Sequence, residues 1–278
     1  MLGIHIRKEH HSLSQSLADK LPVYAKSAQV FLLNPMSGQS ITAEEDIAAI
    51  KEYIKKTKKT VIAHGSYANI PWSSKSVEMI RQEFALCYKA GISGLIVHLG
   101  AKTNANIDEV IDSLAQIKSK YLENIVLWLE INSHKQDENT FETPEKINKL
   151  FRRIMAKTDG SALLCGLCID TAHLWACGTS MATYSSAKTF LTKLDTLIPI
   201  MFHLNDSTEE FGSGKDIHAQ LCEGKIWREY KRDLAKSGIA FIVNYAKKNN
   251  SVVILERHGD NADDIKHDIS VLKKLGFI

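Results

Sequence analysis

The sequence has few of the residues that mark disulfide-rich, fibrous or membrane-bound proteins. Among its 278 residues are only five cysteines, five prolines and fifteen glycines. It has no run of about eighteen apolar residues, and its start, Met1–Arg7, passes directly into a strand-like pattern that is unlike a signal peptide. We therefore expect an intracellular protein with no membrane partner.

The cysteines form no recognisable redox or zinc motif. Their number is odd, and the one Cys-x-x-Cys pair, Cys165 and Cys168, lies inside an apolar run. A zinc ribbon needs a second pair, and a thioredoxin-like motif places its pair at the start of a helix. We interpret both cysteines as small buried hydrophobic residues.

Composition excludes disorder but does not by itself choose a fold. The net charge is +3, with 44% hydrophobic and 24% charged residues, as in ordinary globular proteins. Such a mild charge neither demands nor excludes nucleic acid. The length fits one large α/β barrel or two ordinary domains.

Strand-like and helix-like segments alternate about eight times along the chain. Strands are predicted at residues 2–6, 29–34, 60–64, 94–98, 125–130, 163–170, 200–205 and 252–256. Helices are predicted at residues 14–26, 44–56, 76–90, 107–118, 144–155 (capped by Thr143), 186–198, 225–248 and 262–275. This alternation predicts an α/β protein, a single (β/α)8 TIM barrel domain over residues 1–278, with its active site at the carboxyl ends of the strands.

Side chains that bind metals recur at these strand ends. Six stand at or just beyond the end of a separate strand: His64, His98, Glu130, Asp170, His203 and Glu256. His173 follows closely after Asp170, and Asp216 and His218 follow the seventh strand. Any one of them is as well explained by a capping or core role, but their recurrence at one rim argues against chance. We expect these side chains to surround one cavity.

The chemistry of this set favours a cluster of divalent ions. Five imidazoles and four carboxylates suit zinc or manganese, and they are too many for a single ion. Closely spaced divalent ions suit hydrolysis of phosphate esters, because one activates water while the others neutralise charge on the oxygens. The residues alone thus predict metal-dependent phosphodiester or phosphate hydrolysis, with the ester unspecified.

Several strings resemble those of a known family, endonuclease IV (AP endonuclease family 2). They are Val97-His98-Leu99-Gly100, Cys168-Ile-Asp-Thr-Ala-His173, His203-Leu-Asn-Asp206, Asp216-x-His218 and Leu255-Glu256. The resemblance runs from Gly3 to about Glu256, nearly the whole chain. Phrases such as Ala63-His-Gly-Ser-Tyr67, Pro71-Trp-Ser73 and Met201-Phe-His-Leu-Asn205 resemble the branch encoded by large DNA viruses.

The resemblance implies three zinc ions per chain, with Mn2+ as the alternative ion at one site. By matching motif, the first zinc is held by His64, His98 and Glu130. The second shares Glu130 and is completed by Asp170, His203 and Glu256. The third takes His173, Asp216 and His218. Glu130 and Glu256 are the ligands whose loss we expect to stop catalysis.

The resemblance also implies an activity and its substrates. Family enzymes take part in base excision repair, where they hydrolyse double-stranded DNA on the 5′ side of an abasic nucleotide and leave a 3′-hydroxyl. They also clear blocked 3′ ends, as a 3′-repair diesterase does. We expect the same of this chain, as a monomer, and the viral likeness implies a cytoplasmic or nuclear location, with a viral factory as one such compartment.

DNA contacts are predicted from loops near the strand ends. Tyr67 matches a family residue that enters the base stack, although packing of its ring against the barrel is the alternative. Met36 stands in the loop after the second strand, where bacterial members carry an arginine, and is predicted to act as an apolar wedge. Ile217 replaces a usual arginine, so a phosphate contact is lost unless Lys215 supplies it. The change to Ile131-Asn132 after Glu130 leaves the outer support of the metals open.

Two other runs are interpreted structurally. The basic run Lys55–Lys59 lies at a helix end before the third strand, opposite the site, and we interpret it as a solvated face. Gly212-Ser-Gly214 lacks the strand-to-helix context of a phosphate cradle, and we interpret it as a flexible loop that delivers Asp216 and His218.

Two other functions fit part of the pattern. Sugar isomerases of the xylose-isomerase type share the barrel and need only the quartet Glu130, Asp170, His203 and Glu256. They do not need His173, Asp216 and His218 to hold a third ion, so finding these three side chains together favours a nuclease. A catalytically silent DNA-binding barrel is the other alternative, and missing ligands would be its mark.

Overall fold

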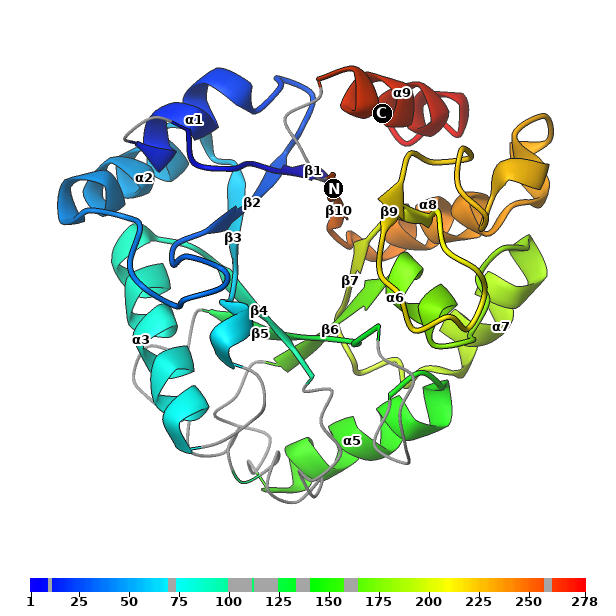
Figure 1. The fold of residues 1–278 in the computed structure, drawn as a ribbon, viewed down its shortest axis with the longest axis horizontal. Coiled ribbons are helices and arrows are strands. Elements are labelled where there is room, and N and C mark those ends of the chain that lie inside the picture. Colours follow the sequence, from blue (N-terminus) through cyan, green and yellow to red (C-terminus); the bar gives the residue numbers. More distant parts are fainter. Residues whose placement is uncertain are drawn as a thin grey trace. The chain divides into compact units, whose positions relative to one another are not determined.

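The computed structural model describes residues 1–9, 12–69, 74–99, 112, 125–133, 141–157, 165–257 and 262–278. The barrel strands are β1 (Leu2–His5), β2 (Ser27–Phe31), β3 (Thr60–His64), β4 (Gly94–His98), β5 (Val126–Glu130), β6 (Cys165–Asp170), β7 (Ile200–His203) and β10 (Val253–Leu255). They close into a barrel in the order β1-β10-β7-β6-β5-β4-β3-β2 (Figure 1). The predicted TIM barrel is confirmed.

Helices follow most of the strands. They are α1 (Leu13–Lys20), α2 (Glu44–Thr57), α3 (Ser74–Ala90), α5 (Pro144–Lys157), α6 (Thr171–Ala176), α7 (Tyr184–Lys193), α8 (Gly238–Asn249) and α9 (Ala262–Lys274). Short 3-10 turns are η1 (Tyr67–Asn69), η3 (Arg228–Tyr230) and η4 (Leu234–Lys236). The cap predicted for α5 is confirmed, because the Thr143 hydroxyl accepts the backbone N–H of Lys146 at 3.4 Å. Apart from residue 112, the helix predicted at 107–118 lies outside the described residues.

The chain divides into two compact units. The first comprises residues 4–130 and 150–166, and the second residues 1–3, 131–149 and 167–278. In the first unit, β4 pairs in parallel with β5 so that His98 lies opposite Glu130. In the second, β6 pairs with β7 so that Asp170 lies opposite His203. Parallel pairing in register thus sets metal-competent side chains beside one another within each unit. The single domain expected over residues 1–278 stays a prediction.

The first helix is shorter than predicted. Helical spacing predicts residues 14–26, whereas α1 ends at Lys20 and Leu21 is already extended. Pro22 explains the difference, because a proline disfavours helical backbone at the residue before it. The start of α1 is held by Asp46 of α2, whose carboxylate accepts the N–H of Leu13 at 2.6 Å.

The segment predicted as one helix at 225–248 consists of η3, η4 and α8. The long helix α8 begins only at Gly238, after Ser237, whose hydroxyl accepts the N–H of Ala240. A Cβ added at Gly238 would lie 1.7 Å from the carbonyl oxygen of Met181. The close approach of two backbone segments therefore requires glycine here, and apolar periodicity alone does not show it.

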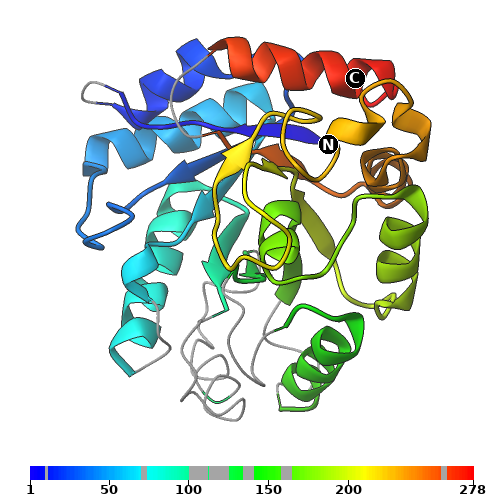
Figure 2. The ribbon, with the colours of Figure 1, turned by 45° about the vertical axis from the view of Figure 1, so that its right-hand side comes forward.

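Two small elements were not predicted. One is the six-residue helix α6, directly after β6. The other is an antiparallel hairpin of β8 (Asp206–Ser207) and β9 (His218–Ala219). Its connecting loop, yellow in the ribbon, passes beside α6 (Figure 2). These elements carry three of the predicted ligands.

Several smaller predictions are settled by burial. All five cysteines are free, and Cys168 is buried as predicted, whereas Cys165 is only partly buried. The run Lys55–Lys58 is exposed, in agreement with a solvated face. Within the described part of the chain, no helix has the length and apolar character needed to cross a membrane.

Candidate metal centre

The predicted ligands stand where the strands end. His64 ends β3, His98 ends β4, Glu130 ends β5, Asp170 ends β6 and His203 ends β7, while Glu256 directly follows β10. In a closed parallel barrel the carboxyl ends of the strands meet at one mouth. Within each unit, the fold thus places these residues at the carboxyl ends of the strands.

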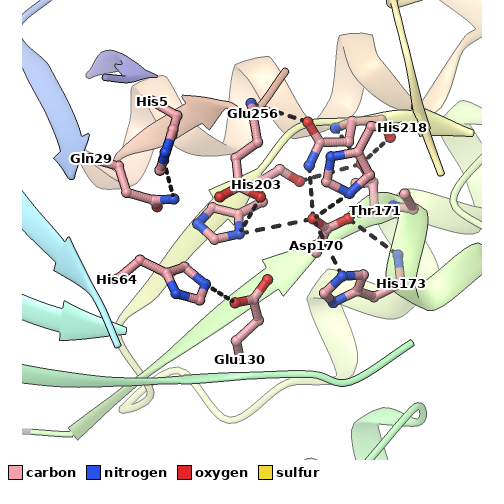
Figure 3. A network of polar contacts seen from close by, with 12 residues as sticks. His5, Gln29, His64, Glu130, Asp170, Thr171, His173, His203, His218 and Glu256 are labelled. Carbon is pink, nitrogen blue, oxygen red and sulfur yellow. Dashed lines mark hydrogen bonds and ion pairs between the residues drawn. The ribbon is translucent and has the colours of Figure 1, made fainter. Parts of the chain in front are cut away.

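His64, His98 and Glu130 form the first cluster. Nε2 of His64 and Nε2 of His98 lie 3.1 and 3.0 Å from the same carboxylate oxygen, Oε2 of Glu130. His64 is 3% and Glu130 is 1% exposed, so the pair is screened from water. Figure 3 shows the His64 ring directed at the Glu130 carboxylate.

The tautomer of His64 is set by its own loop. Nδ1 of His64 lies 2.8 Å from the carbonyl oxygen of Gly65, which only accepts hydrogen bonds, so Nδ1 carries the proton. In its neutral form the ring then presents the lone pair of Nε2 to the carboxylate. Two facing lone pairs repel each other unless a cation lies between them. This is the arrangement of a histidine metal ligand that donates its other N–H to a carbonyl.

A side chain of α3 holds the loop after β3. The buried carboxylate of Glu83 accepts the N–H of Ser66 at 2.9 Å. A Cβ added at Gly65 would lie 2.9 Å from the carbonyl oxygen of Ile96. The backbone that fixes His64 is therefore packed tightly against β4, and sequence analysis did not identify this support.

Asp170, His203 and Glu256 form the second cluster. Nδ1 of His203 lies 3.1 Å from Oε2 of Glu256 and 3.8 Å from Oδ2 of Asp170. Asp170 and His203 are fully buried. The other oxygen of Asp170, Oδ1, caps α6 by accepting the N–H of Ala172 at 2.7 Å and of His173 at 3.1 Å. Asp170 thereby starts the helix on which the next ligand lies, and its second oxygen faces the imidazoles.

His173, Asp216 and His218 form the third cluster. Nε2 of His173 and Nε2 of His218 each lie 3.0 Å from Asp216, one from each carboxylate oxygen. Nδ1 of His173 donates to the carbonyl oxygen of Ile131 at 2.6 Å, which leaves Nε2 for a ligand role. The backbone of Ile131 thus supplies outer support that the sequence left open.

Charge in the third cluster favours a cation. Burial alone would raise the pKa of Asp216, but the imidazoles of His173 and His218 hold it well below its usual range. Burial alone would lower the pKa of His218, but the carboxylates of Asp170, Asp216 and Glu256 raise it. The surroundings therefore stabilise positive charge at this point, which a divalent ion supplies.

The loop that carries Asp216 and His218 is held by hydrogen bonds to α6. Gly212 N–H donates to the carbonyl of Trp175 at 2.9 Å, and Gly214 N–H donates to that of Ala176 at 3.0 Å. Gly212 and Gly214 adopt φ of 70° and 71°, which favour glycine. Hydrogen bonds to the end of α6 therefore place a loop that the sequence led us to expect as flexible.

Asp206 holds the other end of this loop and was given no role by sequence analysis. Its fully buried carboxylate accepts the N–H groups of Ser207 at 2.8 Å, Cys222 at 3.0 Å and Ile226 at 2.9 Å. In the sequence, this role of Asp206 could have been suspected from its place in the string His203-Leu-Asn-Asp206. Asp206 organises the chain on both sides of the hairpin that presents His218.

The residues fit divalent metal ions. Two ligands about 2.1 Å from one tetrahedral ion lie about 3.4 Å apart, and the separations of 3.0 to 3.9 Å between imidazole nitrogens and carboxylate oxygens bracket that value. Ligand atoms lie within 4.8 Å of one another in His64–His98–Glu130 and in Asp170–His173–His218. Nitrogen and oxygen donors without thiolate suit zinc.

The predicted DNA contacts lie on exposed segments. Tyr67 in η1 is 41% exposed, yet its ring also packs edge-on against His64 and His98 at centroid distances of 5.5 and 5.3 Å. Met36 is 76% exposed. The Lys215 amine lies 3.9 Å from Glu209, and Ile217 is 52% exposed. Tyr67 therefore combines the packing role with an accessible face.

A family model and individual relatives resemble this chain. The model described as the xylose isomerase-like TIM barrel matches residues 26–275. A probable AP endonuclease of African swine fever virus (isolate Pig/Kenya/KEN-50/1950) is 39% identical over 242 residues, covering 84% of this chain and 79% of that protein. A probable endonuclease 4 of Thermosipho africanus is 29% identical, covering 89% and 88%.

A solved structure supports the same assignment. The crystal structure of AsfvAP:AG superposes with a TM-score of 0.89 at 32% identity, covering 99% of this chain and 98% of that one. Sequence and fold agree over nearly the whole length. The chain therefore belongs to the xylose isomerase-like TIM barrel family and, within it, to the endonuclease IV (AP endonuclease 2) group.

Proposed function

We propose that this protein is a zinc-dependent apurinic/apyrimidinic endonuclease that hydrolyses the DNA phosphodiester on the 5′ side of an abasic site and leaves a 3′-hydroxyl. The main support is the third cluster, in which both oxygens of Asp216 face imidazoles of His173 and His218 at 3.0 Å. A single-ion or two-ion sugar isomerase has no use for this cluster. The relatives named AP endonuclease and endonuclease 4 support the same activity.

The proposed ligand roles follow the family's arrangement. His64, His98 and Glu130 hold the first ion. Asp170, His203 and Glu256 hold the second, with Glu130 shared, and His173, Asp216 and His218 hold the third. When bound, such ions activate water at neutral pH and stabilise negative charge on phosphate oxygens. Glu130 and Glu256 are the carboxylates whose loss we expect to stop the reaction.

The protein's own backbone orients these ligands. Gly65 and Ile131 accept the Nδ1–H of His64 and His173, so each ring turns its Nε2 towards a carboxylate. Asp170 is fixed by two N–H groups at the start of α6. Little reorganisation is then needed when an ion or a phosphate arrives, which is the condition for strong electrostatic stabilisation of the transition state.

Substrate recognition is proposed for the exposed loops. An abasic nucleotide leaves the helix at low cost because it has no base to unstack. In this proposal Tyr67 and the apolar side chain of Met36 enter the base stack, and Lys215 contacts a phosphate. Double-stranded DNA with abasic sites or blocked 3′ ends is the proposed partner.

A duplex with one tetrahydrofuran abasic analogue tests the proposal. The analogue cannot undergo β-elimination, so a nick on its 5′ side requires hydrolysis. We expect nicking that stops with a chelator, returns with zinc, and leaves a 3′ end that a polymerase extends. The undamaged duplex is the control for substrate, and Glu256→Gln is the control for a contaminating nuclease.

The same preparation distinguishes the proposed nuclease from a sugar isomerase. Metal analysis should give about three zinc ions per chain for the nuclease, and one or two ions for an isomerase. A fully metallated protein that leaves the abasic duplex intact would contradict the nuclease, and ketose and aldose sugars would be the next substrates.

Three finer predictions accompany the proposal. A duplex with a 3′-phosphoglycolate end tests the 3′-repair diesterase activity, and light scattering tests the monomer. The prediction that Mn2+ can replace one zinc is tested by measuring the metal content of protein expressed in the presence of both ions. The compartment, whether cytoplasm, nucleus or viral factory, stays a prediction.

A further inference from the structure

Asn205 joins two of the proposed metal ligands. It lies two residues beyond the end of β7, is fully buried, and its Nδ2 donates to Oδ2 of Asp170 at 2.7 Å. Its Oδ1 accepts the backbone N–H of Glu256 at 3.2 Å. One side chain thus contacts the carboxylate of one proposed ligand and the backbone of another.

Asn205 contacts the oxygen of Asp170 that faces the imidazoles. Oδ1 of Asp170 is occupied by two backbone N–H groups of α6. Oδ2 lies 3.5 Å from Nε2 of His218 and 3.8 Å from Nδ1 of His203. Oδ2 is therefore the atom through which Asp170 reaches an ion, and the hydrogen bond from Asn205 fixes its position.

Arg257 determines which way the Asn205 amide points. Its Nη1 donates at 2.7 Å to Oδ1 of Asn205 and at 2.7 Å to the carbonyl oxygen of Glu256. A guanidinium has donors only, so the amide must turn its oxygen to Arg257 and its NH2 to Asp170. A flipped amide would place NH2 against the guanidinium and oxygen against the carboxylate, and both contacts repel.

Arg257 is itself held by α9. Its Nε donates to Oδ2 of Asp268 at 2.7 Å, and Nη2 forms an ion pair with the same carboxylate. Asp268 is fully buried and Arg257 is 8% exposed. Charge-assisted hydrogen bonds of this kind hold the guanidinium in one orientation. A continuous series of hydrogen bonds therefore leads from α9 through Arg257 and Asn205 to Asp170.

We propose that Asn205, oriented by Arg257, is a positioning residue for the zinc ions that Asp170 and Glu256 bind, an inference that rests on the proposed function of this site. Hydrogen-bonded partners of ligating side chains set the direction of the ligand lone pairs, and their loss typically costs about 10- to 100-fold in metal affinity or activity. Asn205 does not reach the reacting phosphate. Its effect should therefore appear in zinc affinity and kcat, and not in KM.

Zinc affinity of the full chain, measured by competition with a chromophoric chelator, tests the proposal directly. We expect Asn205→Ala to weaken at least one zinc by about 10- to 100-fold and to lower kcat with KM unchanged. Asn148→Ala is the matched control. Its amide is also hydrogen-bonded at both ends, to Lys193 O and Asp195 N at 2.8 Å, but in a different place. We expect it to leave zinc affinity and kcat unaltered.

A double-mutant cycle separates orientation from general destabilisation. Arg257→Lys keeps a cation beside Asp268 but lacks the planar fork, so it should weaken zinc binding while Asn205 is present. In the Asn205→Ala background the same change should have a smaller effect, which comes from its remaining contact with the Glu256 carbonyl. An equal loss in both backgrounds would overturn the proposed route through Asn205, and unchanged zinc affinity in Asn205→Ala would overturn the positioning role. A wild-type chain that binds no zinc would instead refute the proposed function.

Discussion

At the scale of single residues, the histidine rings are oriented before any ion binds. His64 and His173 each donate Nδ1–H to a backbone carbonyl, at 2.8 and 2.6 Å. Both carbonyls, of Gly65 and Ile131, belong to residues directly after a strand end. The backbone conformation at those ends therefore selects the tautomer, and the side chain at Ile131 has little influence on it. This explains why an unusual residue after Glu130 leaves the support of the centre intact.

The first prediction concerns Glu130, whose Oε2 faces both His64 and His98. Glu130→Gln keeps the shape but removes the charge and turns one oxygen into a donor group. We expect a loss of cleavage of abasic duplex larger than the roughly 10- to 100-fold typical of an outer partner, together with loss of bound zinc. The readouts are kcat and metal content. Full activity in a folded variant would exclude the proposed ligand role.

The second prediction concerns Ile217, which is 52% exposed between Asp216 and His218. The family usually carries arginine there, so Ile217→Arg should add a phosphate contact. We expect tighter binding of abasic duplex and a slope of log Kd against log salt that is steeper by about one. Fluorescence anisotropy across a salt series measures this. Ile217→Gln, of similar size without charge, is the control, and an unchanged slope for the arginine variant would contradict the contact.

At the scale of elements, the hairpin of β8 and β9 depends on close contacts with the loop that follows it. A Cβ at Gly224 would lie 2.4 Å from Oδ1 of Asp206 and 2.5 Å from the carbonyl oxygen of Ser207. Lys225 N–H donates to that same carbonyl at 2.6 Å. The chain therefore passes directly over the Asp206 carboxylate, and only a glycine leaves room for it.

Gly224→Ala is accordingly expected to displace the hairpin that carries His218. We expect a loss of about 1 to 3 kcal/mol in the free energy of unfolding, as for overpacking, together with weaker binding of one zinc. Urea unfolding and chelator competition measure the two effects. Gly276→Ala is the control, because its φ of 65° strains alanine by about 1 to 2 kcal/mol at a place where the nearest atom to the added Cβ, Nζ of Lys247, is at an ordinary contact distance of 3.9 Å. Equal zinc loss in both variants would argue against a specific role of the hairpin.

The Asp206 carboxyl predicts a pH effect at the same hairpin. Burial raises the pKa of Asp206 from 3.8 to about 6. Hydrogen bonds from backbone N–H groups lower this pKa, but burial has the larger effect. The folded state then binds the proton more tightly than the unfolded state, so this group's contribution to stability falls as pH rises from about 4 through 6. Asp206→Asn cannot ionise. Its unfolding free energy relative to the wild type should rise by about 1 to 3 kcal/mol over that range, and parallel pH curves from urea unfolding would refute this.

The sequence predicted the strands well and the hairpin not at all, for physical reasons. β3 and β4 were predicted at their observed bounds because runs such as Gly94–His98 are short, apolar and end in a polar residue. Strands of two residues, such as Asp206–Ser207, are too short to show periodicity. Their pairing depends on contacts of Asp206 with residues up to twenty positions away, which no local pattern encodes.

The site shows the same division between local and distant information. Its proposed ligands could be named from the sequence because strand ends and family strings are local features. Asn205 stood inside one such string, yet its role depends on Arg257 and Asp268, which are distant in the chain. Glu83 was missed for the same reason, since α3 gives no sign that one carboxylate is turned towards Ser66.

At the scale of the whole molecule, the proposed ligands stand at or directly after six different strand ends or on the segments that follow them. Carboxylates such as Glu130, 1% exposed, and Asp170, 0% exposed, are costly to bury without a neutralising cation. Ions that bind only the folded chain stabilise it by mass action. The proposed metals should therefore contribute to the stability of the fold as well as to its chemistry.

Removal of metal is thus expected to lower the melting temperature of the protein. Zinc at about 100 times its Kd contributes roughly 2.7 kcal/mol per site, which for a chain of this size corresponds to about 5 to 10 °C. Differential scanning calorimetry before and after dialysis against a chelator measures the change. Added zinc should restore the melting temperature, whereas magnesium should not, because it prefers an octahedral oxygen shell and dehydrates reluctantly. Glu130→Gln should respond less than the wild type. A melting temperature that stays the same after complete loss of zinc would show that the ions serve the reaction alone.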